Sequence, residues 1–407
     1  MKRTIALALV FVFLAAFAAS GDSLTVTTPG GASVTFDADL RSDGVELDEN
    51  GEIPGSLYPV KELGKYGYIN EQGITVIKHV FSEAERFHEG YAAVKFMGLY
   101  GYINKAGWLV IPYLYDEAKQ FSEGKAAVKK DGKWGYIDSS GKVVIPFQFD
   151  DCGPFSEGRA AVAETVDENK RYGYIDETGK KVISCEYEAA DGFSGGLARV
   201  SRPGEYYHFI DKNGKTVISM RGMYYSFSEG LSMREMKQYC YRFINTSGQQ
   251  VTKDYWYAYP YFRDGLTVVA DNYSQYYYIK PNGAKSFGDK TFVDAKPFSD
   301  GYAAVKIYKY QDRTQAPAAP PMRPGCYYPP PLPSYYTYID NSGEYATDKR
   351  FEEAGSFQDG FAVIEEREEK IDPITGRSTS VTKQKLINKN FEIIWVFEDY
   401  VPFRYLR

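Results

Sequence analysis

Residues Phe121 to Phe155 read FSEGKAAVKKDGKWGYIDSSGKVVIPFQFDDCGPF, and variants of this stretch recur along most of the 407-residue chain. Each copy contains an element equivalent to Tyr136-Ile137-Asp138. From one such isoleucine to the next, the nine copies are separated by 34, 34, 38, 35, 34, 35, 60 and 48 residues. A period of this length is typical of repeat proteins, in which each unit buries its apolar face against its neighbours. The sequence therefore predicts nine repeats within residues 57–407.

Within one copy the sequence predicts three short strands, at 125–129, 133–138 and 142–149. The third contains Pro146, whose missing N–H indicates a sheet edge or a bulge. About 34 residues are few for a four-stranded propeller blade. We therefore expect an all-β fold of tandem three-stranded antiparallel units in a curved, solenoid-like array. A closed, propeller-like ring is the alternative.

Two tight turns connect these strands. Asp131-Gly132 is a pair that favours a two-residue hairpin turn, because glycine adopts positive φ without strain. Asp138 begins the second turn and Gly141 ends it. An Asx side chain at this first position can accept a backbone N–H from the turn.

A small residue stands two positions after the glycine of every Phe-x-x-Gly element. The column consists of Ala92, Ala126, Ala160, Ala198, Ser232, Thr267, Ala303 and Ala362. A larger side chain would overpack a junction where neighbouring backbones approach each other closely. The column therefore predicts a buried contact in each repeat.

An acidic residue precedes the same glycine in most copies. These residues are Glu89, Glu123, Glu157, Glu229, Asp264, Asp300 and Asp359. A row of carboxylates could hold cations or a basic partner. Because the acid recurs in nearly every copy, we favour a structural role in the turn, with the side chain exposed or bonded to local backbone.

The copy Gly132-Lys133-Trp134-Gly135-Tyr136-Ile137-Asp138 resembles the WG-repeat family of bacterial proteins, and the resemblance extends over about residues 57–403. The tryptophan of the motif occurs once and tyrosine replaces it in most other copies. Its glycine is replaced in later copies, for example by His208, Arg242 and Thr337. The resemblance implies an all-β repeat domain, often exported, with no common activity.

The first 20 residues have the pattern of a secretory signal peptide. Lys2 and Arg3 precede an apolar run from Ile5 to Phe17, and either Ala16-Phe17-Ala18 or Ala18-Ala19-Ser20 provides a cleavage site of small residues. An uncleaved membrane anchor is the alternative, but the run is shorter than the roughly 20 residues that a membrane-spanning helix needs. We expect a protein that is secreted, periplasmic or at the cell surface, with no transmembrane segment after signal removal.

Three segments interrupt or flank the repeats. Residues 21–56 form an N-terminal segment in which Leu24 to Phe36 alternates around Pro29-Gly30-Gly31, so we expect a β hairpin that caps the first repeat. The insertion at about 307–336 is rich in proline and tyrosine, and the one at about 365–384 reads as a protruding hairpin. Insertions in repeat proteins collect on one face, which is often the binding face.

The composition restricts the possible partners and cofactors. A net charge of −6 argues against nucleic acid, which binds basic surfaces. Four cysteines lie in different copies without metal-ligand spacing, so a zinc site is not expected, and their pairing stays open: Cys152, Cys185, Cys240 and Cys326. We expect no metal and no cofactor.

No catalytic residues stand out. His79, His88 and His208 each occupy an ordinary repeat position, and none accompanies a nucleophile motif. The surplus of aromatic residues is the better functional indication, because tyrosine and tryptophan suit the binding of peptides and sugars. The candidate binding residues are Tyr255, Trp256, Tyr257, Tyr259, Tyr261, Tyr327, Tyr328, Tyr335 and Tyr336. Burial within or between strands is the alternative for each of them.

These observations predict an exported, non-enzymatic repeat protein that acts as a binding scaffold for protein partners at the cell envelope or outside the cell. Two other functions stay open. One is a glycan- or cell-wall-binding module that uses exposed tyrosine and tryptophan. The other is a carboxylate-based hydrolase, whose paired acids leave no sequence signature of their own.

Overall fold

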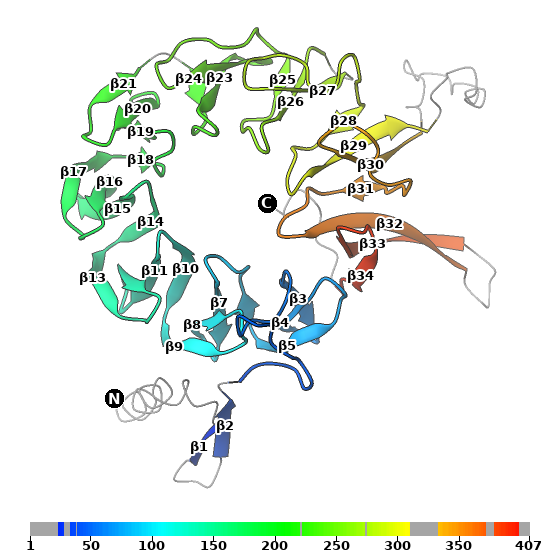
Figure 1. Cartoon of the computed structure of the whole chain (residues 1–407). Coiled ribbons are helices and arrows are strands. Elements are labelled where there is room, and N and C mark those ends of the chain that lie inside the picture. Colours follow the sequence, from blue (N-terminus) through cyan, green and yellow to red (C-terminus); the bar gives the residue numbers. More distant parts are fainter. Residues whose placement is uncertain are drawn as a thin grey trace. The chain divides into compact units, whose positions relative to one another are not determined.

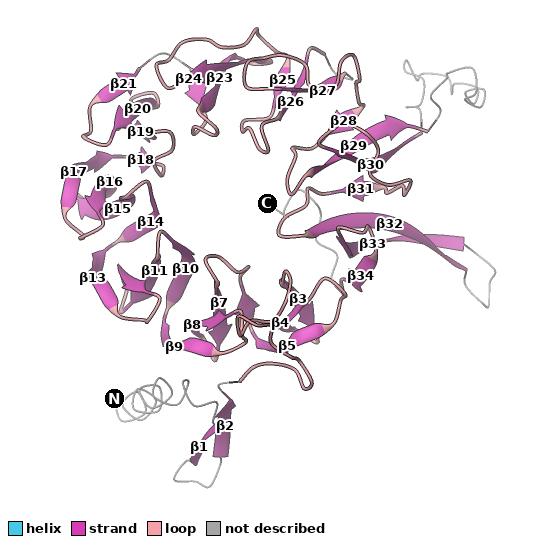
Figure 2. Ribbon diagram, in the orientation of Figure 1, coloured by secondary structure: helices cyan, strands magenta, loops and turns pink. Residues whose placement is uncertain are grey.

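A computed structural model of the chain describes residues 23–27, 33–37, 39–219, 222–272, 275–309, 333–371 and 378–398. The chain divides into two compact units, Met1–Arg221 and Gly222–Arg407. Every regular element in the described ranges is a β-strand, as Figure 2 shows. The all-β prediction is therefore confirmed. Among the described residues, no helix has the length and apolar composition needed to cross a membrane.

Besides a two-stranded sheet near the N-terminus, the first unit contains five antiparallel sheets that follow one another in chain order (Figure 1). The first of these five sheets has three strands and the other four have four. The strands are β3 (Tyr58–Glu62), β4 (Lys65–Ile69) and β5 (Thr75–Phe81); β6 (Glu83–Ala84), β7 (Tyr91–Phe96), β8 (Leu99–Asn104) and β9 (Leu109–Tyr115); β10 (Glu117–Ser122), β11 (Lys125–Lys130), β12 (Lys133–Asp138) and β13 (Val143–Phe149); β14 (Asp151–Ser156), β15 (Arg159–Val166), β16 (Asn169–Asp176) and β17 (Lys181–Tyr187); and β18 (Ala189–Ala190), β19 (Leu197–Ser201), β20 (His208–Asp211) and β21 (Thr216–Ile218).

The second unit contains four further sheets of the same kind, the last with four strands and the others with three. Their strands are β22 (Met223–Tyr224), β23 (Leu231–Lys237) and β24 (Cys240–Asn245); β25 (Tyr257–Ala258), β26 (Thr267–Ala270) and β27 (Tyr276–Ile279); β28 (Asp294–Ala295), β29 (Tyr302–Tyr308) and β30 (Ser334–Asp340); and β31 (Glu353–Ala354), β32 (Phe361–Ile371), β33 (Ser378–Asn388) and β34 (Ile393–Val396).

The three predicted strands of the quoted copy are β11, β12 and β13, but a fourth strand precedes them. Strand β10 pairs antiparallel with β11, and the register shifts between Ala118 and Phe121. Strand order in the sheet equals chain order. The expectation of three-stranded, solenoid-like units is therefore wrong for the five sheets that have four strands, because four-stranded meanders are the sheets of a propeller blade.

Pro146 lies in a bulge of the last strand. Tyr136 pairs with Ile145, whereas Trp134 pairs with Phe149, so β13 has extra residues opposite a single residue of β12. Because the bulge leaves backbone groups unpaired, it accommodates a residue that has no N–H. The prediction of an edge strand or a bulge is confirmed.

The glycine of the repeat explains which sheets have a full last strand. A Cβ atom on Gly135 would lie 2.7 Å from the backbone oxygen of Ile145 in the last strand. Gly67, Gly101 and Gly173 have equivalent backbone contacts at 2.4–2.6 Å. The last strand has seven residues in all four of these sheets, namely β5, β9, β13 and β17.

Where another residue replaces this glycine, the last strand is shorter or is not formed. With His208 it has three residues, β21. The sheets with Arg242 in β24 and Thr337 in β30 end after three strands. A side chain at this position occupies the space that the carbonyl of the last strand needs. In the last sheet Lys385 holds the position, and β34 has only four residues. The glycine is therefore a packing requirement of a full-length last strand.

The core lies between neighbouring sheets. Tyr136 and Ile137 of β12 and Val128 of β11 are fully buried. The ring of Tyr136 packs edge-on against that of Phe155 in the next sheet, with 4.9 Å between ring centres. The predicted column of small residues is buried throughout, with at most 2% of each residue exposed: Ala92, Ala126, Ala160, Ala198, Ser232, Thr267, Ala303 and Ala362.

The N-terminal segment pairs as a hairpin of β1 (Ser23–Thr27) and β2 (Ser33–Asp37). The residues that follow it lie across the first two sheets. The N–H of Leu40 donates to the carbonyl of Gly107 at 3.0 Å, and the N–H of Ser42 donates to that of Val76 at 3.0 Å. Residues 39–42 therefore tie these two sheets together.

The two insertions extend from long hairpins. Strands β29 and β30 pair as far as Tyr308 and Ser334, and most of the Pro-Tyr loop between them lies outside the described residues. Strands β32 and β33 pair over eleven residues each and project beyond their sheet in Figure 1.

Candidate functional site

The candidate aromatic residues do not form a single surface. Tyr255 and Tyr336 are buried, with 3% and 2% of their surface exposed, so they belong to the core and not to a binding face. Tyr257 is half-buried and packs edge-on against Tyr276, 5.2 Å between ring centres. Burial raises the pKa of Tyr255 and of Tyr257 to about 12, so both phenols stay protonated at neutral pH.

The remaining candidates have different surroundings. Tyr259 and Tyr261 are half-buried and pack against each other with 6.2 Å between ring centres. The guanidinium of Arg350 lies 4.6 Å from the ring centre of Tyr335, a cation–π contact. Tyr327 and Tyr328 lie outside the described residues.

Trp256 is half-buried and instead pairs with Tyr239, an exposed residue that was not among the candidates. Its ring stacks on that of Tyr239, with 5.2 Å between ring centres and 11° between ring planes. Tyr239 is 49% exposed and lies at the tip of the β23–β24 hairpin with φ 61°. We call Tyr239 and Trp256 the aromatic pair. Only its position at a hairpin tip could have indicated Tyr239 from the sequence.

Several charged residues lie close to the aromatic pair in the sequence. The guanidinium of Arg242 donates to the carboxylate of Asp254 at 2.7 Å. The thiol of Cys240 lies 3.6 Å from the same carboxylate. Lys253 forms an ion pair with Asp271 at 2.9 Å. A partly exposed aromatic pair with polar neighbours is a common feature of protein-binding surfaces.

Cysteine pairing was left open by the sequence, and Cys152, Cys185 and Cys240 have free thiols. Burial raises the pKa of Cys152 to about 12 and that of Cys185 to about 11. Cys326 lies outside the described residues. The two thiols with raised pKa values are therefore protonated at neutral pH and are poor nucleophiles.

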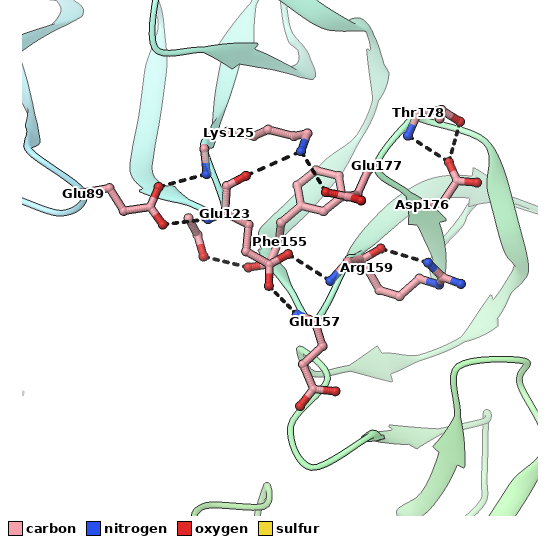
Figure 3. Close-up of polar contacts among 12 residues, drawn as sticks. Glu89, Glu123, Lys125, Phe155, Glu157, Arg159, Asp176, Glu177 and Thr178 are labelled. Carbon is pink, nitrogen blue, oxygen red and sulfur yellow. Dashed lines mark hydrogen bonds and ion pairs between the residues drawn. The ribbon is translucent and has the colours of Figure 1, made fainter.

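The acidic column links successive repeats, as Figure 3 shows. The N–H groups of Glu123 and Gly124 donate to the carboxylate of Glu89 at 2.8 and 2.9 Å. The carboxylate of Glu123 in turn accepts hydrogen bonds from Glu157 and Gly158, at 2.6 and 2.9 Å. Each acid thus binds the turn of the following repeat, and we call these contacts the carboxylate links.

The carboxylate links continue along each unit. In the first unit the carboxylate of Glu157 accepts from the N–H of Gly196 at 3.0 Å. In the second unit the corresponding pairs are Glu229 with Gly265 at 3.3 Å, Asp264 with Gly301 at 3.2 Å and Asp300 with Gly360 at 2.7 Å. The structural role predicted for the acidic column is supported, but the expectation of bonds to local backbone is wrong.

The turn that receives each carboxylate has an unusual backbone. Glu123 and Gly124 both adopt positive φ, 52° and 71°. In this turn two successive N–H groups point to the two oxygens of one carboxylate. Such a pair of backbone donors forms an anion-binding nest. The carboxylate links therefore satisfy backbone donors with charge-assisted hydrogen bonds.

Further side chains reinforce the junctions between sheets. The hydroxyl of Tyr136 donates to the carbonyl of Gly153 at 2.8 Å, and that of Ser122 donates to the carbonyl of Phe155 at 2.7 Å. Within the repeat, the carboxylate of Asp138 accepts a hydrogen bond from the N–H of Ser140 in its own turn at 2.9 Å, as predicted. Hydrogen bonds from the hydroxyl of Ser140 and from backbone N–H groups lower the pKa of Asp138.

One hollow of about 360 Å³ lies at the turns of the second unit. It is lined by Asp300, Gly301, Tyr302, Asp340, Asn341, Ser342 and Lys389. Asp300 already forms a carboxylate link there. Within the described ranges, no group of three or more histidine, cysteine, aspartate or glutamate side chains has the arrangement of a metal site.

The repeat geometry can be compared with known families. A model of the WG containing repeat matches the sequence five times, at residues 66–99, 100–134, 134–164, 172–206 and 336–368. The chain contains WG repeats. The WG repeat supplies the glycine that admits the last strand and, in the quoted copy, Trp134, whose ring lies 4.7 Å from the ammonium group of Lys119.

Solved structures with similar folds have low sequence identity to this WG-repeat chain. BamB from Moraxella catarrhalis is 10% identical with a TM-score of 0.35, and the match covers 70% of this chain and 97% of that chain. KlHsv2 with loop 6CD replaced by a Gly-Ser linker is 10% identical with a TM-score of 0.35, covering 65% and 92%. The WD40 beta propeller domain of Doa1 is 9% identical with a TM-score of 0.29, covering 53% and 86%. None of the curated proteins matches the sequence significantly.

Proposed function

We propose that this protein is an exported, non-enzymatic scaffold that binds a partner protein through the surface around the aromatic pair. The observation that carries the proposal is the stacking of Trp256 on the exposed ring of Tyr239. Tryptophan and tyrosine are enriched among the residues that dominate binding energy at protein interfaces. The ion pairs of Arg242 and Lys253 would supply a polar rim.

The fold supports a scaffold role because it presents side chains on a fixed framework. Successive sheets are connected by buried packing and by carboxylate links such as that from Glu89 to Gly124. A surface that is ordered before binding loses less conformational entropy when a partner binds. We infer that the sheets within each unit act as propeller-type blades, in place of the expected solenoid turns.

The test of this proposal is the effect of Trp256→Ala on binding of a partner. The partner would first be isolated from a cell-envelope extract on the immobilised wild-type chain and then purified. We expect Trp256→Ala to weaken its affinity by about 30-fold, which corresponds to the roughly 2 kcal/mol lost at a binding hot spot. Isothermal titration calorimetry would measure the change.

A matched control uses Tyr206, which is 68% exposed in the first unit. Tyr206→Ala should leave the affinity unchanged. If the purified partner binds Trp256→Ala as tightly as wild type, the aromatic pair is not the binding surface. Retention of the wild-type chain on insoluble polysaccharide, lost in Trp256→Ala, would support the glycan-binding alternative, because stacked aromatic rings also suit sugars.

A further inference from the structure

The turns of this chain contain a carboxylate-binding site that is used repeatedly. Six turns donate backbone N–H groups to an acidic side chain of the preceding repeat, at distances from 2.6 to 3.3 Å. The glycines of these turns are Gly124, Gly158, Gly196, Gly265, Gly301 and Gly360. The chain itself therefore shows that a side-chain carboxylate is a group that this nest binds.

Two further turns have the same backbone without such a link. Glu89 and Gly90 adopt φ values of 50° and 84°, and Glu229 and Gly230 adopt 48° and 79°, close to those of the linked turns. Among the described residues, no side chain accepts a hydrogen bond from the N–H groups of these four residues.

The sequence explains both cases. No Phe-x-x-Gly element precedes Gly90, because this element first occurs at Phe87 to Gly90. The element that precedes Gly230 in the chain reads Phe-Ser-Gly-Gly, with Gly195 at the acidic position. Neither turn therefore follows a Phe-x-x-Gly element with an acid at the position that forms the carboxylate links.

We propose that the turns at Glu89–Gly90 and Glu229–Gly230 bind the carboxylate of an acidic residue in a partner protein. This inference rests on the proposed scaffold function and specifies the chemistry of the partner. Glu89, Glu229 and Gly230 are exposed, and Gly90 is half-exposed. The carboxylates of Glu89 and Glu229 are already bound by the following turns, so they do not occupy their own N–H groups. Capture of a carboxylate by a backbone nest is a known mode of peptide recognition.

The native ligand of the linked turns suggests the probe. The carboxylate comes from Ser-Glu-Gly at residues 122–124, so a blocked acetyl-Ser-Glu-Gly-amide peptide presents the same group. We would titrate it into the ¹⁵N-labelled, deuterated full chain and follow backbone amide resonances. Gly90 and Gly230 should shift saturably, whereas Gly124 and Gly158 should not move. The matched acetyl-Ser-Gln-Gly-amide peptide should bind about tenfold more weakly, because its hydrogen bonds lack the anionic acceptor.

A second peptide distinguishes the source of the carboxylate. Acetyl-Ser-Gly-Gly with a free C-terminus presents a main-chain carboxylate, and shifts of Gly90 and Gly230 with this peptide alone would assign the nests to chain termini and overturn the side-chain proposal. Unchanged Gly90 and Gly230 resonances with all peptides, or equal shifts with the glutamate and glutamine peptides, would also overturn it.

The variant Glu89→Ala provides an internal control. It removes the carboxylate from Glu123 and Gly124 and opens a third nest of known geometry. The amide of Gly124 should then respond to the glutamate peptide in a variant whose other resonances show the native fold. If Gly124 does not respond, a separate carboxylate does not bind this nest and the inference fails. A negative result in these titrations would not contradict the binding of a partner through Trp256, because that proposal is tested by a different variant.

Discussion

Substituting Gly173 by alanine should lower the free energy of unfolding by about 3 kcal/mol, since overpacking a filled site typically costs 1–3 kcal/mol or more. A Cβ atom at this position would lie 2.4 Å from the backbone oxygen of Ile183, 2.7 Å from the carbonyl carbon of Ser184 and 2.8 Å from the nitrogen of Cys185. All three are backbone atoms of β17, so no side chain can rotate away to make room. Urea unfolding followed by circular dichroism would measure the loss.

Gly153→Ala is the matched control, because Gly153 belongs to the same sheet, in β14. A Cβ atom there would lie 3.7 Å from its nearest neighbour, an ordinary contact. We expect a change within about 1 kcal/mol, in either direction. Equal destabilisation by the two substitutions would show that the close approach of β17 does not explain the glycine of the WG repeat.

Replacing Tyr136 by alanine should have a similar or larger effect, a loss of about 3–5 kcal/mol. The side chain is fully buried and packs against Phe155 of the next sheet. Tyr136→Phe should cost only about 1 kcal/mol, because it keeps the ring and removes the hydrogen bond to the carbonyl of Gly153. The measurement is the urea midpoint of each variant.

The exposed Tyr206 gives the reference for this series, and Tyr206→Ala should change stability by less than about 0.5 kcal/mol. Tyr136→Ala should thus be the most destabilising of the three substitutions, followed by Tyr136→Phe and then Tyr206→Ala. If the alanine substitutions at 136 and 206 had the same effect, the tyrosine of the repeat would not be part of the core between the sheets.

The repeated pattern was enough to predict the central part of each sheet. Asp131-Gly132 and Asp138 define tight turns through local chemistry, and Pro146 indicates a bulge through its missing N–H. Strand β10 could not be predicted in the same way. Its residues Glu117 to Ser122 lack the alternation of a half-buried strand, and they form a strand because β11 offers a partner.

The carboxylate links show a second limit of the sequence pattern. An acid that recurs once per repeat has the same periodicity whether it binds its own turn or the next one. The carboxylate of Glu123 binds the N–H of Gly158, 35 residues later in the chain. This contact can be identified only from the structure, in which neighbouring repeats pack against each other. The role of the acidic column in the fold was therefore predictable, whereas its partner was not.

The candidate binding residues were selected by composition, which does not separate the two faces of a strand. Tyr255 and Trp256 are adjacent in the sequence, yet the first is buried and the second stacks on an exposed ring. Alternation of successive side chains explains the difference. Tyr239 was not selected because it lies at a hairpin tip, 17 residues from Trp256 in the sequence.

The most direct test of the carboxylate links is the hydrogen-exchange rate of the glycine amides that follow the acidic column, measured by NMR on the native chain. Gly124 and Gly230 are both exposed and have nearly the same φ, but only Gly124 donates to a carboxylate. We expect the amide of Gly124 to exchange at least about tenfold more slowly than that of Gly230, because exchange requires the hydrogen bond to open. Equal exchange rates at Gly124 and Gly230 would contradict the account that the carboxylate links hold neighbouring repeats together.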